Sequence, residues 1–262
     1  MKTPLNIGII GAGGRMGRSL IENAANIDGL EITAAIERPG SDKLGSQLGP
    51  QRISVTGNLA SCINDCDVII DFSTPDACMS AVRTAANAGV PVVTGTTGLS
   101  AEQQLELQTL ATQIPILQAA NFSVGVNILA RLVELASRAS GEEFDLEVFE
   151  AHHKHKVDAP SGTALMLGKA AAAGRDLELE KVATWAREGN TGARTSDEIG
   201  FQVLRGGDIV GEHTVFVCGD GERIELTHRA TDRGIFARGA LRAARWLHPR
   251  QPGTYDMADV LF

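Results

Sequence analysis

The chain has 262 residues, of which 43% are hydrophobic, and its formal net charge is −8 at pH 7. This length suits one large domain or two smaller ones, and the acidic balance argues against a protein that binds nucleic acid over a broad basic face. No apolar run approaches the ~18 residues of a membrane span, and the N-terminus leads directly into a predicted strand, so we expect neither a membrane segment nor a secretory signal.

A glycine-rich turn follows the first predicted strand. Leu5–Ile10 is an apolar run typical of a buried strand, residues 11–17 read Gly-Ala-Gly-Gly-Arg-Met-Gly, and a helical stretch continues to about Asn26. A second strand is predicted over Glu31–Ile36. This order is typical of a dinucleotide-binding unit, in which glycines let the backbone approach the pyrophosphate and the helix N-terminus donates N–H groups to it.

The turn differs from the standard GxGxxG pattern, because Met16 stands at the third glycine position. The chain has instead three glycines spaced three residues apart, Gly11, Gly14 and Gly17. Glu37 follows the second strand, where a carboxylate accepts hydrogen bonds from an adenosine ribose, and Arg38 can pair with a 2′-phosphate. We therefore expect both NADH and NADPH as cofactors, although the same pair also fits an exposed strand end.

Strands and helices continue to alternate up to about residue 123. Three further strands are predicted over Val68–Asp71, Pro91–Thr94 and Ile116–Ala119. Helices are predicted over Pro75–Ala88 and after a capping box of Ser100 and Gln103. The alternation predicts a Rossmann-type, doubly wound parallel sheet, whose ligands bind beyond the carboxyl ends of the strands. We expect the small, polar turns at this edge to surround the nicotinamide; they are 71–75, 95–98 and 119–122.

The pattern changes after a long amphipathic helix predicted over Val124–Ser140. A strand over 144–151 and a helix over 161–173 precede three successive strands, Ile199–Leu204, Glu212–Val217 and Arg223–Ala230. Successive strands predict an α+β domain with a mostly antiparallel open sheet over residues 124–233. A helix over 235–247 is expected to return to the first domain, which comprises 1–123 and 234–262. Residues 187–197 are predicted to form a loop, and the tail from Tyr255 a strand or an extended segment.

The stretch Glu150–Ala164 is the strongest candidate for a site. It places three histidines and two lysines within 152–156, then a turn, then the start of an alanine-rich helix at Ser161-Gly162-Thr163. The N–H groups and dipole of a helix N-terminus bind anions, and cations beside it strengthen this preference, so we expect a small substrate with carboxylates. Two alternatives stay open: a solvated loop, and a metal site at His153 and His155, which lack a third ligand at zinc-like spacing.

The residue types of this stretch also suit reduction by a nicotinamide. Hydride transfer to a conjugated ring leaves negative charge that a proton must quench, and histidine is the side chain that titrates near neutral pH. A lysine ammonium stabilises developing negative charge and holds a carboxylate. The four cysteines, Cys62, Cys66, Cys78 and Cys218, form no CxxC pair, which is typical of reduced thiols in a cytoplasmic protein.

Four motifs occur in one order along the chain. They are Gly-Ala-Gly-Gly-Arg-Met-Gly at 11–17, Gly-Thr-Thr-Gly at 95–98, Ala-Ala-Asn-Phe-Ser-Val-Gly-Val-Asn at 119–127 and Glu-Ala-His-His-Lys-His-Lys-Val-Asp-Ala-Pro-Ser-Gly-Thr-Ala at 150–164. With Arg205–His213, they resemble the 4-hydroxy-tetrahydrodipicolinate reductase (dihydrodipicolinate reductase) family over essentially the full length. The resemblance implies NAD(P)H-dependent reduction of a cyclic dicarboxylate to tetrahydrodipicolinate in lysine and diaminopimelate biosynthesis. It also implies a nucleotide-binding domain, a substrate domain and a homotetramer built through the substrate-domain sheets.

The resemblance further implies a role for each site residue, with no departure at these positions. The pyrophosphate would be held by Gly11, Ala12, Gly13, Gly14, Arg15 and Met16, the ribose by Glu37 and a 2′-phosphate by Arg38. The nicotinamide would be lined by Gly95, Thr96, Thr97, Ala119, Ala120, Asn121 and Phe122. His152 would be the proton donor, with Lys156 as a second donor, and the substrate carboxylate would be bound by His153, Gly162 and Thr163. No metal is expected.

Two other functions remain open at this point. The chain could be another amino-acid-pathway NAD(P)-dependent dehydrogenase, which substrate profiling would reveal. It could also be a nucleotide-sensing regulatory protein, since a fold does not fix a function. Such a protein would bind NAD(H) without consuming NADH.

Overall fold

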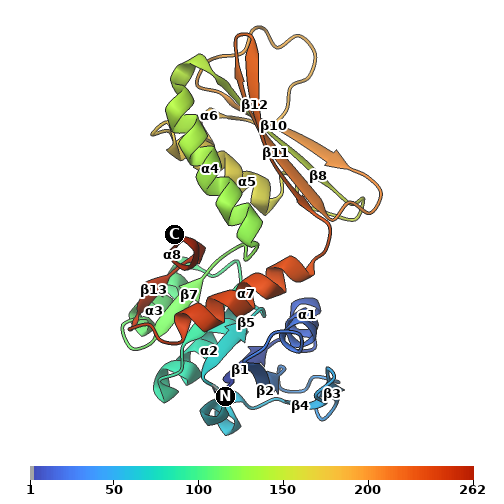
Figure 1. Ribbon diagram of the computed structural model, residues 1–262, viewed down its shortest axis with the longest axis vertical. Coiled ribbons are helices and arrows are strands. Elements are labelled where there is room, and N and C mark those ends of the chain that lie inside the picture. The colour runs from blue at the N-terminus through green and yellow to red at the C-terminus, as the bar shows by residue number, and fades with distance from the viewer. Residues whose placement is uncertain (1–2) are drawn as a thin grey trace. The chain divides into compact units, whose positions relative to one another are not determined.

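The computed structural model describes residues 3–262, which divide into two compact units (Figure 1). One unit contains the described residues up to Val124 together with Gly234–Phe262, and the other contains Gly125–Arg233. None of the helices in this described range is both long enough and apolar enough to cross a lipid bilayer.

The first unit is built on an eight-stranded sheet in the order β13-β7-β6-β5-β1-β2-β4-β3. Its strands are β1 (Leu5–Ile10), β2 (Leu30–Ile36), β3 (Gln47–Leu48), β4 (Ile53–Thr56), β5 (Val68–Asp71), β6 (Val92–Thr94), β7 (Pro115–Gln118) and β13 (Gly253–Tyr255). All neighbouring strands are parallel except β3 and β4. The doubly wound parallel sheet is therefore confirmed, whereas the short pair β3–β4 was not predicted.

Helices cover both faces of this sheet, which explains why its central strands are apolar over most of their length. The helices on one face are α1 (Arg15–Ala24), α7 (Gly234–Leu247) and α8 (Met257–Leu261). The helices on the other face are α2 (Pro75–Ala88) and α3 (Ala101–Leu110), with the 3₁₀ turns η1 (Leu59–Ser61) and η2 (Ile63–Asp65). The expected capping box of α3 is present, with Ser100 and Gln103 bonded reciprocally.

The second unit has a five-stranded sheet in the order β12-β11-β8-β10-β9. Its strands are β8 (Asp145–His152), β9 (Ala183–Thr184), β10 (Ile199–Arg205), β11 (Gly211–Gly219) and β12 (Glu222–Ala230). Most paired residues lie in the antiparallel ladders of β11 with β8 and β12, as expected. The strand β10 runs parallel to β8, because helix α5 (Gly162–Ala173) forms a crossover between them.

Helices α4 (Val124–Ser140) and α5 pack on one face of the second sheet (Figure 1). The short elements η3 (Gly141–Glu143) and α6 (Leu179–Val182) complete this unit. Side chains of a strand alternate between faces, so Leu146 and Val148 of β8 face the helices and enter the core. Glu150 and His152 continue on that same face and are buried as well. The apolar strand therefore ends in two buried polar residues.

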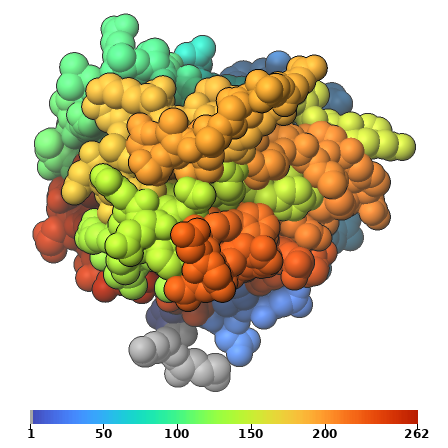
Figure 2. All heavy atoms as spheres, turned by 90° about the horizontal axis from the view of Figure 1, so that it is seen from above, coloured from blue at the N-terminus to red at the C-terminus, as the bar shows by residue number. Residues whose placement is uncertain are grey.

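The structure confirms the prediction for one irregular segment and contradicts the prediction for the C-terminal tail. The segment 187–197 is a loop, as predicted, and Figure 2 shows yellow-orange atoms of this part of the chain on the face seen there. The strand predicted for the tail is wrong beyond Tyr255. Helix α8 follows it, because Asp256 and Asp259 form a capping box and Met257 and Val260 pack in the first core.

Candidate active site

The glycine turn joins β1 to α1 with the features that a bound phosphate requires. Gly11 has a φ of +72°, and a Cβ on Gly17 would lie 2.4 Å from the Gly11 carbonyl oxygen, so neither position accepts a side chain. Helix α1 begins at Arg15 without a side-chain cap and without an acidic residue in its first turn. Its first N–H groups and positive dipole end therefore suit an anion.

Met16 does not impair this turn. Its side chain packs against the apolar cluster of the first unit, while Gly17 provides the close contact between α1 and the turn. The third glycine is needed for close packing, and the chain supplies it one residue later than the standard pattern.

Glu37 lies against the glycine turn. Its Oε1 accepts a hydrogen bond from the Gly13 N–H at 2.8 Å, and the Lys43 ammonium donates to the Gly13 carbonyl oxygen, also at 2.8 Å. Arg38 is exposed beside a pocket of about 250 Å³. Small and apolar residues from β1, β2 and α2 line this pocket, among them Ile10, Ile36, Ala77 and Ala81.

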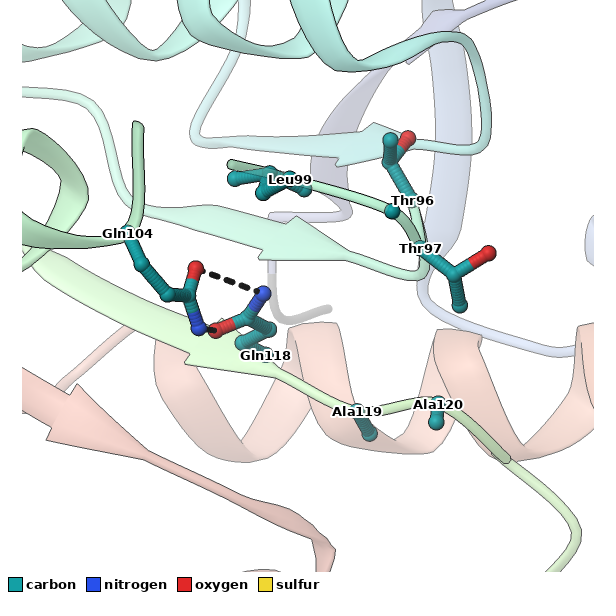
Figure 3. A pocket seen from close by; sticks show the side chains of 8 residues that line it. Thr96, Thr97, Leu99, Gln104, Gln118, Ala119 and Ala120 are labelled. Carbon is teal, nitrogen blue, oxygen red and sulfur yellow. Dashed lines mark hydrogen bonds between the residues drawn. The ribbon is translucent and has the colours of Figure 1, made fainter. Parts of the chain in front are cut away.

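A second pocket, of about 390 Å³, lies at the carboxyl ends of β6 and β7 (Figure 3). Its walls include four of the expected nicotinamide residues: Thr96, Thr97, Ala119 and Ala120. Gln104 and Gln118 bond to each other at its side. The side chain of Phe122 does not line this pocket, because it is only 2% exposed and packs edge-on against Phe72 in the core.

Asp71 holds the loops that form this second pocket. Its carboxylate is fully buried and accepts hydrogen bonds from the hydroxyls of Ser73, Thr94 and Thr96. These donors come from the ends of β5 and β6, so one carboxylate ties two neighbouring loops together. Both pockets and the uncapped helix lie along the carboxyl edge of one parallel sheet, where a dinucleotide binds. The residues present therefore fit such a cofactor.

Glu150 is the centre of a buried polar cluster in the second unit. Its carboxylate is fully buried and lies against His152 Nδ1, the Ser161 N–H and the Arg205 guanidinium. Burial alone would raise the pKa of Glu150, but its hydrogen bonds to His152, Arg205 and Ser161 outweigh burial and lower the pKa to about 2. Glu150 is therefore ionised at neutral pH.

Three neighbouring strands and one helix deliver these groups. On β10 the residue paired with His152 is Arg205, and on β11 the residue paired with Glu150 is His213. The His152 ring meets the His213 ring at 5.1 Å, and His213 Nε2 lies 3.1 Å from the Ser161 hydroxyl. Burial, with His152 nearby, lowers the pKa of His213 to about 4, so His213 is neutral at pH 7.

The loop after β8 carries the other expected substrate groups. The Lys156 ammonium lies 2.9 Å from both carboxylate oxygens of Asp158, and this hydrogen bonding lowers the pKa of Asp158. His153 Nε2 lies 3.0 Å from the Arg233 guanidinium. Partial burial and then the Arg233 charge lower the pKa of His153. Lys156, the expected second proton donor, is thus held in an ion pair.

Helix α5 begins beside this cluster. Ser161 caps it by accepting a hydrogen bond from the Ala164 N–H, and no acidic residue stands in its first turn. Gly162 is exposed, and a Cβ there would meet nothing within 4 Å. Since Glu150 bonds both His152 and the Ser161 N–H, the first turn of α5 is held close to the His152 ring.

The buried cluster around Glu150 also contains three potential metal ligands, a set that the spacing of residues along the sequence could not reveal. Possible ligand atoms of Glu150, His152 and His213 lie within 4.8 Å of one another. However, Arg205 donates to both oxygens of Glu150, so a cation would have to displace a guanidinium. We therefore assign no metal to this cluster. The pair His153 and His155 lies in the loop, with ring centroids 6.2 Å apart.

Comparison with known proteins settles the family. Residues 5–122 match the family model described as "Dihydrodipicolinate reductase, N-terminus", and residues 125–261 match "Dihydrodipicolinate reductase, C-terminus". The chain belongs to the dihydrodipicolinate reductase family.

Relatives in this reductase family match over nearly the full length. A "4-hydroxy-tetrahydrodipicolinate reductase" of Acinetobacter baumannii is 51% identical, with 100% of this chain and 97% of the relative covered. One of Nitrosomonas europaea is 47% identical, with 99% and 98% covered. The solved "Dipicolinate bound Dihydrodipicolinate reductase" of Paenisporosarcina sp. TG-14 has a similar fold, with a TM-score of 0.79 at 24% identity, over 97% of this chain and 98% of that one. The Rossmann-type domain of this reductase family implies a pyridine nucleotide cofactor.

The structure of this reductase also shows polar residues for which no role was predicted from the sequence. Glu150, Arg205 and Asp71 are central to hydrogen-bond clusters, and Lys43 reaches the glycine turn. A signal existed for Glu150, which occupies a core-facing position two residues after Val148. No such signal exists for Lys43, which lies in a mostly exposed segment after β2.

Proposed function

We propose that this chain reduces 4-hydroxy-tetrahydrodipicolinate to tetrahydrodipicolinate in lysine and diaminopimelate biosynthesis. The substrate, NAD(P)H and a proton yield tetrahydrodipicolinate, NAD(P)⁺ and water. Full-length identity of 51% to a reductase of that name supports this proposal. The geometric observation that carries it is the bonding of one buried carboxylate, Glu150, to both His152 and the start of α5. A proton donor thereby stands beside an anion-binding helix terminus.

In this proposal residues 124–233, which include the whole second unit, bind the substrate. The N–H groups of Gly162 and Thr163 and the side chain of His153 hold a carboxylate, and His152 supplies a proton. Lys156 leaves Asp158 to act as a second donor and to stabilise negative charge on the ring. The exposed Gly162 at the start of α5 and the absence of acidic side chains from the first turn support this assignment.

Residues 1–123 and 234–262 bind the cofactor in this proposal. When bound, NADH or NADPH supplies the hydride. Residues 11–16 bind the pyrophosphate, Glu37 the ribose and Arg38 a 2′-phosphate. The nicotinamide lies against Gly95, Thr96, Thr97 and Ala119–Phe122, with Phe122 acting through its backbone. The uncapped start of α1 and the pocket in Figure 3 support these roles.

We also propose a cytoplasmic homotetramer built through the second-unit sheet. The sheet face opposite α4 and α5 carries Phe149, Leu204 and Phe216, and among the described residues no helix covers it. Leu204 is 42% exposed on this face. These apolar side chains, which share the face with charged residues such as Glu147 and Glu212, support association with another subunit.

A coupled assay tests the proposed reaction. Substrate is generated from pyruvate and aspartate semialdehyde, and oxidation of NADH and NADPH is followed in separate cuvettes. His152→Ala should lower kcat by on the order of 10²-fold or more, with unchanged Kd for NADH by fluorescence. The exposed His155→Ala should retain activity. Equal loss of turnover and NADH binding would remove His152 from the donor role, and binding without NADH oxidation by the wild type would favour a sensor.

A further inference from the structure

We propose that Glu150 and Arg205 act as positioning residues for His152, and this inference rests on the proposed function. Glu150 accepts a hydrogen bond from the Nδ1–H of His152, so that Nε2 is the nitrogen that transfers a proton to the substrate. Arg205 keeps the carboxylate ionised and weakens the electrostatic attraction between that carboxylate and the protonated imidazole.

The bonding of Glu150 determines the tautomer of the imidazole. An ionised carboxylate only accepts hydrogen bonds, so the His152 nitrogen that faces it must carry a hydrogen. The nitrogen that faces Glu150 is Nδ1. The neutral ring left after proton transfer is then the Nδ1–H form, which the carboxylate stabilises. The proton exchanged with a ligand therefore belongs to Nε2.

The surroundings of Nε2 agree with this role. This nitrogen lies 3.0 Å from the point where a Cβ on Gly211 would stand, so the glycine keeps that side of the ring clear. His152 is buried apart from 8% of its surface. The ring is thus fixed on its Nδ1 side, and a side chain at position 211 would crowd its Nε2 side.

Arg205 explains how a fully buried carboxylate stays charged. Its guanidinium donates at 2.9 and 2.8 Å to the two oxygens of Glu150 and also reaches the Asp158 carbonyl oxygen. The Ser161 N–H adds a further donor at 2.9 Å. Without these donors, burial would favour the protonated acid, whose O–H can itself donate to Nδ1, so that Nδ1 would no longer have to carry a hydrogen.

The other titratable groups near the ring leave Glu150 as its acidic partner. On β11, His213 is neutral at pH 7, and in the following loop Lys156 is paired with Asp158. His153 faces Arg233. A substitution at Glu150 or Arg205 should therefore directly change the hydrogen bonding and the tautomer of His152.

Glu150→Gln separates this role from packing, because it preserves shape and removes charge. The donors of Ser161 and Arg205 compete for the single amide oxygen, so the amide NH₂ is turned toward His152. That group donates to Nδ1 and enforces the Nε2–H tautomer. An Asp-to-Asn change in the Ser-His-Asp triad acts by the same logic. We expect kcat to fall on the order of 10²-fold or more, with KM for NADH within about 2-fold of wild type.

The test uses the full-length enzyme and two readouts. Long-range ¹H–¹⁵N NMR of the histidine nitrogens, assigned with His152→Gln, should show Nδ1–H in the wild type and Nε2–H in Glu150→Gln. The alkaline fall of kcat should move to lower pH in Glu150→Gln and to higher pH in Arg205→Met, because these changes remove opposite charges. Glu147→Gln is the matched control: it removes a paired carboxylate from the other face of β8 and should change neither readout.

The outcomes are distinct. A Glu150→Gln enzyme with wild-type turnover and the Nδ1–H tautomer, or pH shifts of the same sign in both variants, overturns the inference. If Glu150→Gln fails to fold, the double variant with Arg205→Met removes both charges together, and the same tautomer and kcat are expected. If the tautomer changes but His152→Ala keeps full turnover, the positioning is supported and the proposed donor role of His152 fails.

Discussion

At the residue scale, the space beside the His152 imidazole depends on one glycine of the sheet, Gly211. Gly211 is the first residue of β11, opposite the end of β8, and its missing Cβ leaves space for the ring. The backbone there has no unusual φ, so the reason for glycine is the close approach of Nε2 and not conformational freedom.

Gly211→Ala should therefore impair catalysis more than folding. The added methyl would lie 3.0 Å from Nε2, closer than ordinary van der Waals contact, and the ring would have to turn away. We expect kcat to fall about 10-fold or more, with Tm nearly unchanged. Gly206→Ala is the control, since its Cβ would meet Leu204 only at 3.7 Å. Full activity of Gly211→Ala would show that the space beside Nε2 of His152 is not needed for catalysis.

His213 makes the fold sensitive to acid. Burial lowers its pKa to about 4, whereas an unfolded histidine titrates near ~6.5. Between these values the unfolded chain binds the proton first, so the free energy of unfolding falls as the pH decreases through this window. The stability is fully present above ~6.5.

His213→Gln should reduce this acid sensitivity. The decrease in unfolding free energy between pH 7 and 4.5 should be smaller than in the wild type, by up to about 3 kcal/mol. Denaturant unfolding at both pH values measures it, and His248→Gln at an exposed position should keep the wild-type decrease. Identical decreases in wild type and His213→Gln would show that His213 is protonated in the folded state.

At the scale of elements, the helix N-termini fall into two kinds. Helices α3, α5 and α8 begin with side-chain caps, whereas α1, which follows the glycine turn, and α2, which begins at Pro75, have none. A side-chain cap satisfies only one or two of the first N–H groups: in α5 Ser161 accepts from the Ala164 N–H, whereas no side chain accepts from the first turn of α1. The loops after β5 and β6 are fixed differently, by hydrogen bonds to the single carboxylate of Asp71.

Asp71→Asn tests this link between the loops. An amide can accept on one oxygen only, so at least one buried hydroxyl of Ser73, Thr94 or Thr96 loses its acceptor. We expect a loss of about 1–3 kcal/mol in unfolding free energy and a several-fold higher KM for NADH, because Thr96 lines the second pocket. The exposed Asp76→Asn serves as the control. A normal KM for NADH despite lower stability would separate Asp71 from cofactor binding.

At the scale of the whole molecule, each unit has its own hydrophobic core, but the units use their sheets differently. The first sheet is covered by helices on both faces. The second sheet has its helices on one face, and its other face carries Phe149 and Phe216. This difference is the basis for placing subunit contacts on the second unit.

Phe216→Glu should disrupt the proposed tetramer. The new carboxylate would lie beside Glu147 and Glu225, the residues paired with Phe216, and would have to be buried on association, so the assembly should dissociate to smaller species. Analytical ultracentrifugation at micromolar concentration measures this, with the exposed Leu135→Glu on α4 as the control. A wild type that sediments as a monomer, or an unchanged mass for Phe216→Glu, would contradict the assembly.

Sequence by itself determined the elements whose cause is local. Apolar runs and periodicity gave β1, β5, α2 and α4 at their observed bounds, and the capping box of Ser100 and Gln103 gave the start of α3. The strand predicted for the tail is wrong because a short helix with its own capping box forms there. The pair β3–β4 was missed since two-residue and four-residue strands carry too little periodic pattern.

Tertiary structure alone decided which polar groups meet. Glu150, Ser161, Arg205 and His213 come from β8, the start of α5, β10 and β11, and strand register brings them together across as many as 63 positions of sequence. The motif at 150–164 contains both Glu150 and His152, but it gives no sign that this carboxylate bonds the His152 ring or that Arg205 bonds both of its oxygens. Burial and cross-strand pairing set these properties, and both depend on the folded chain as a whole.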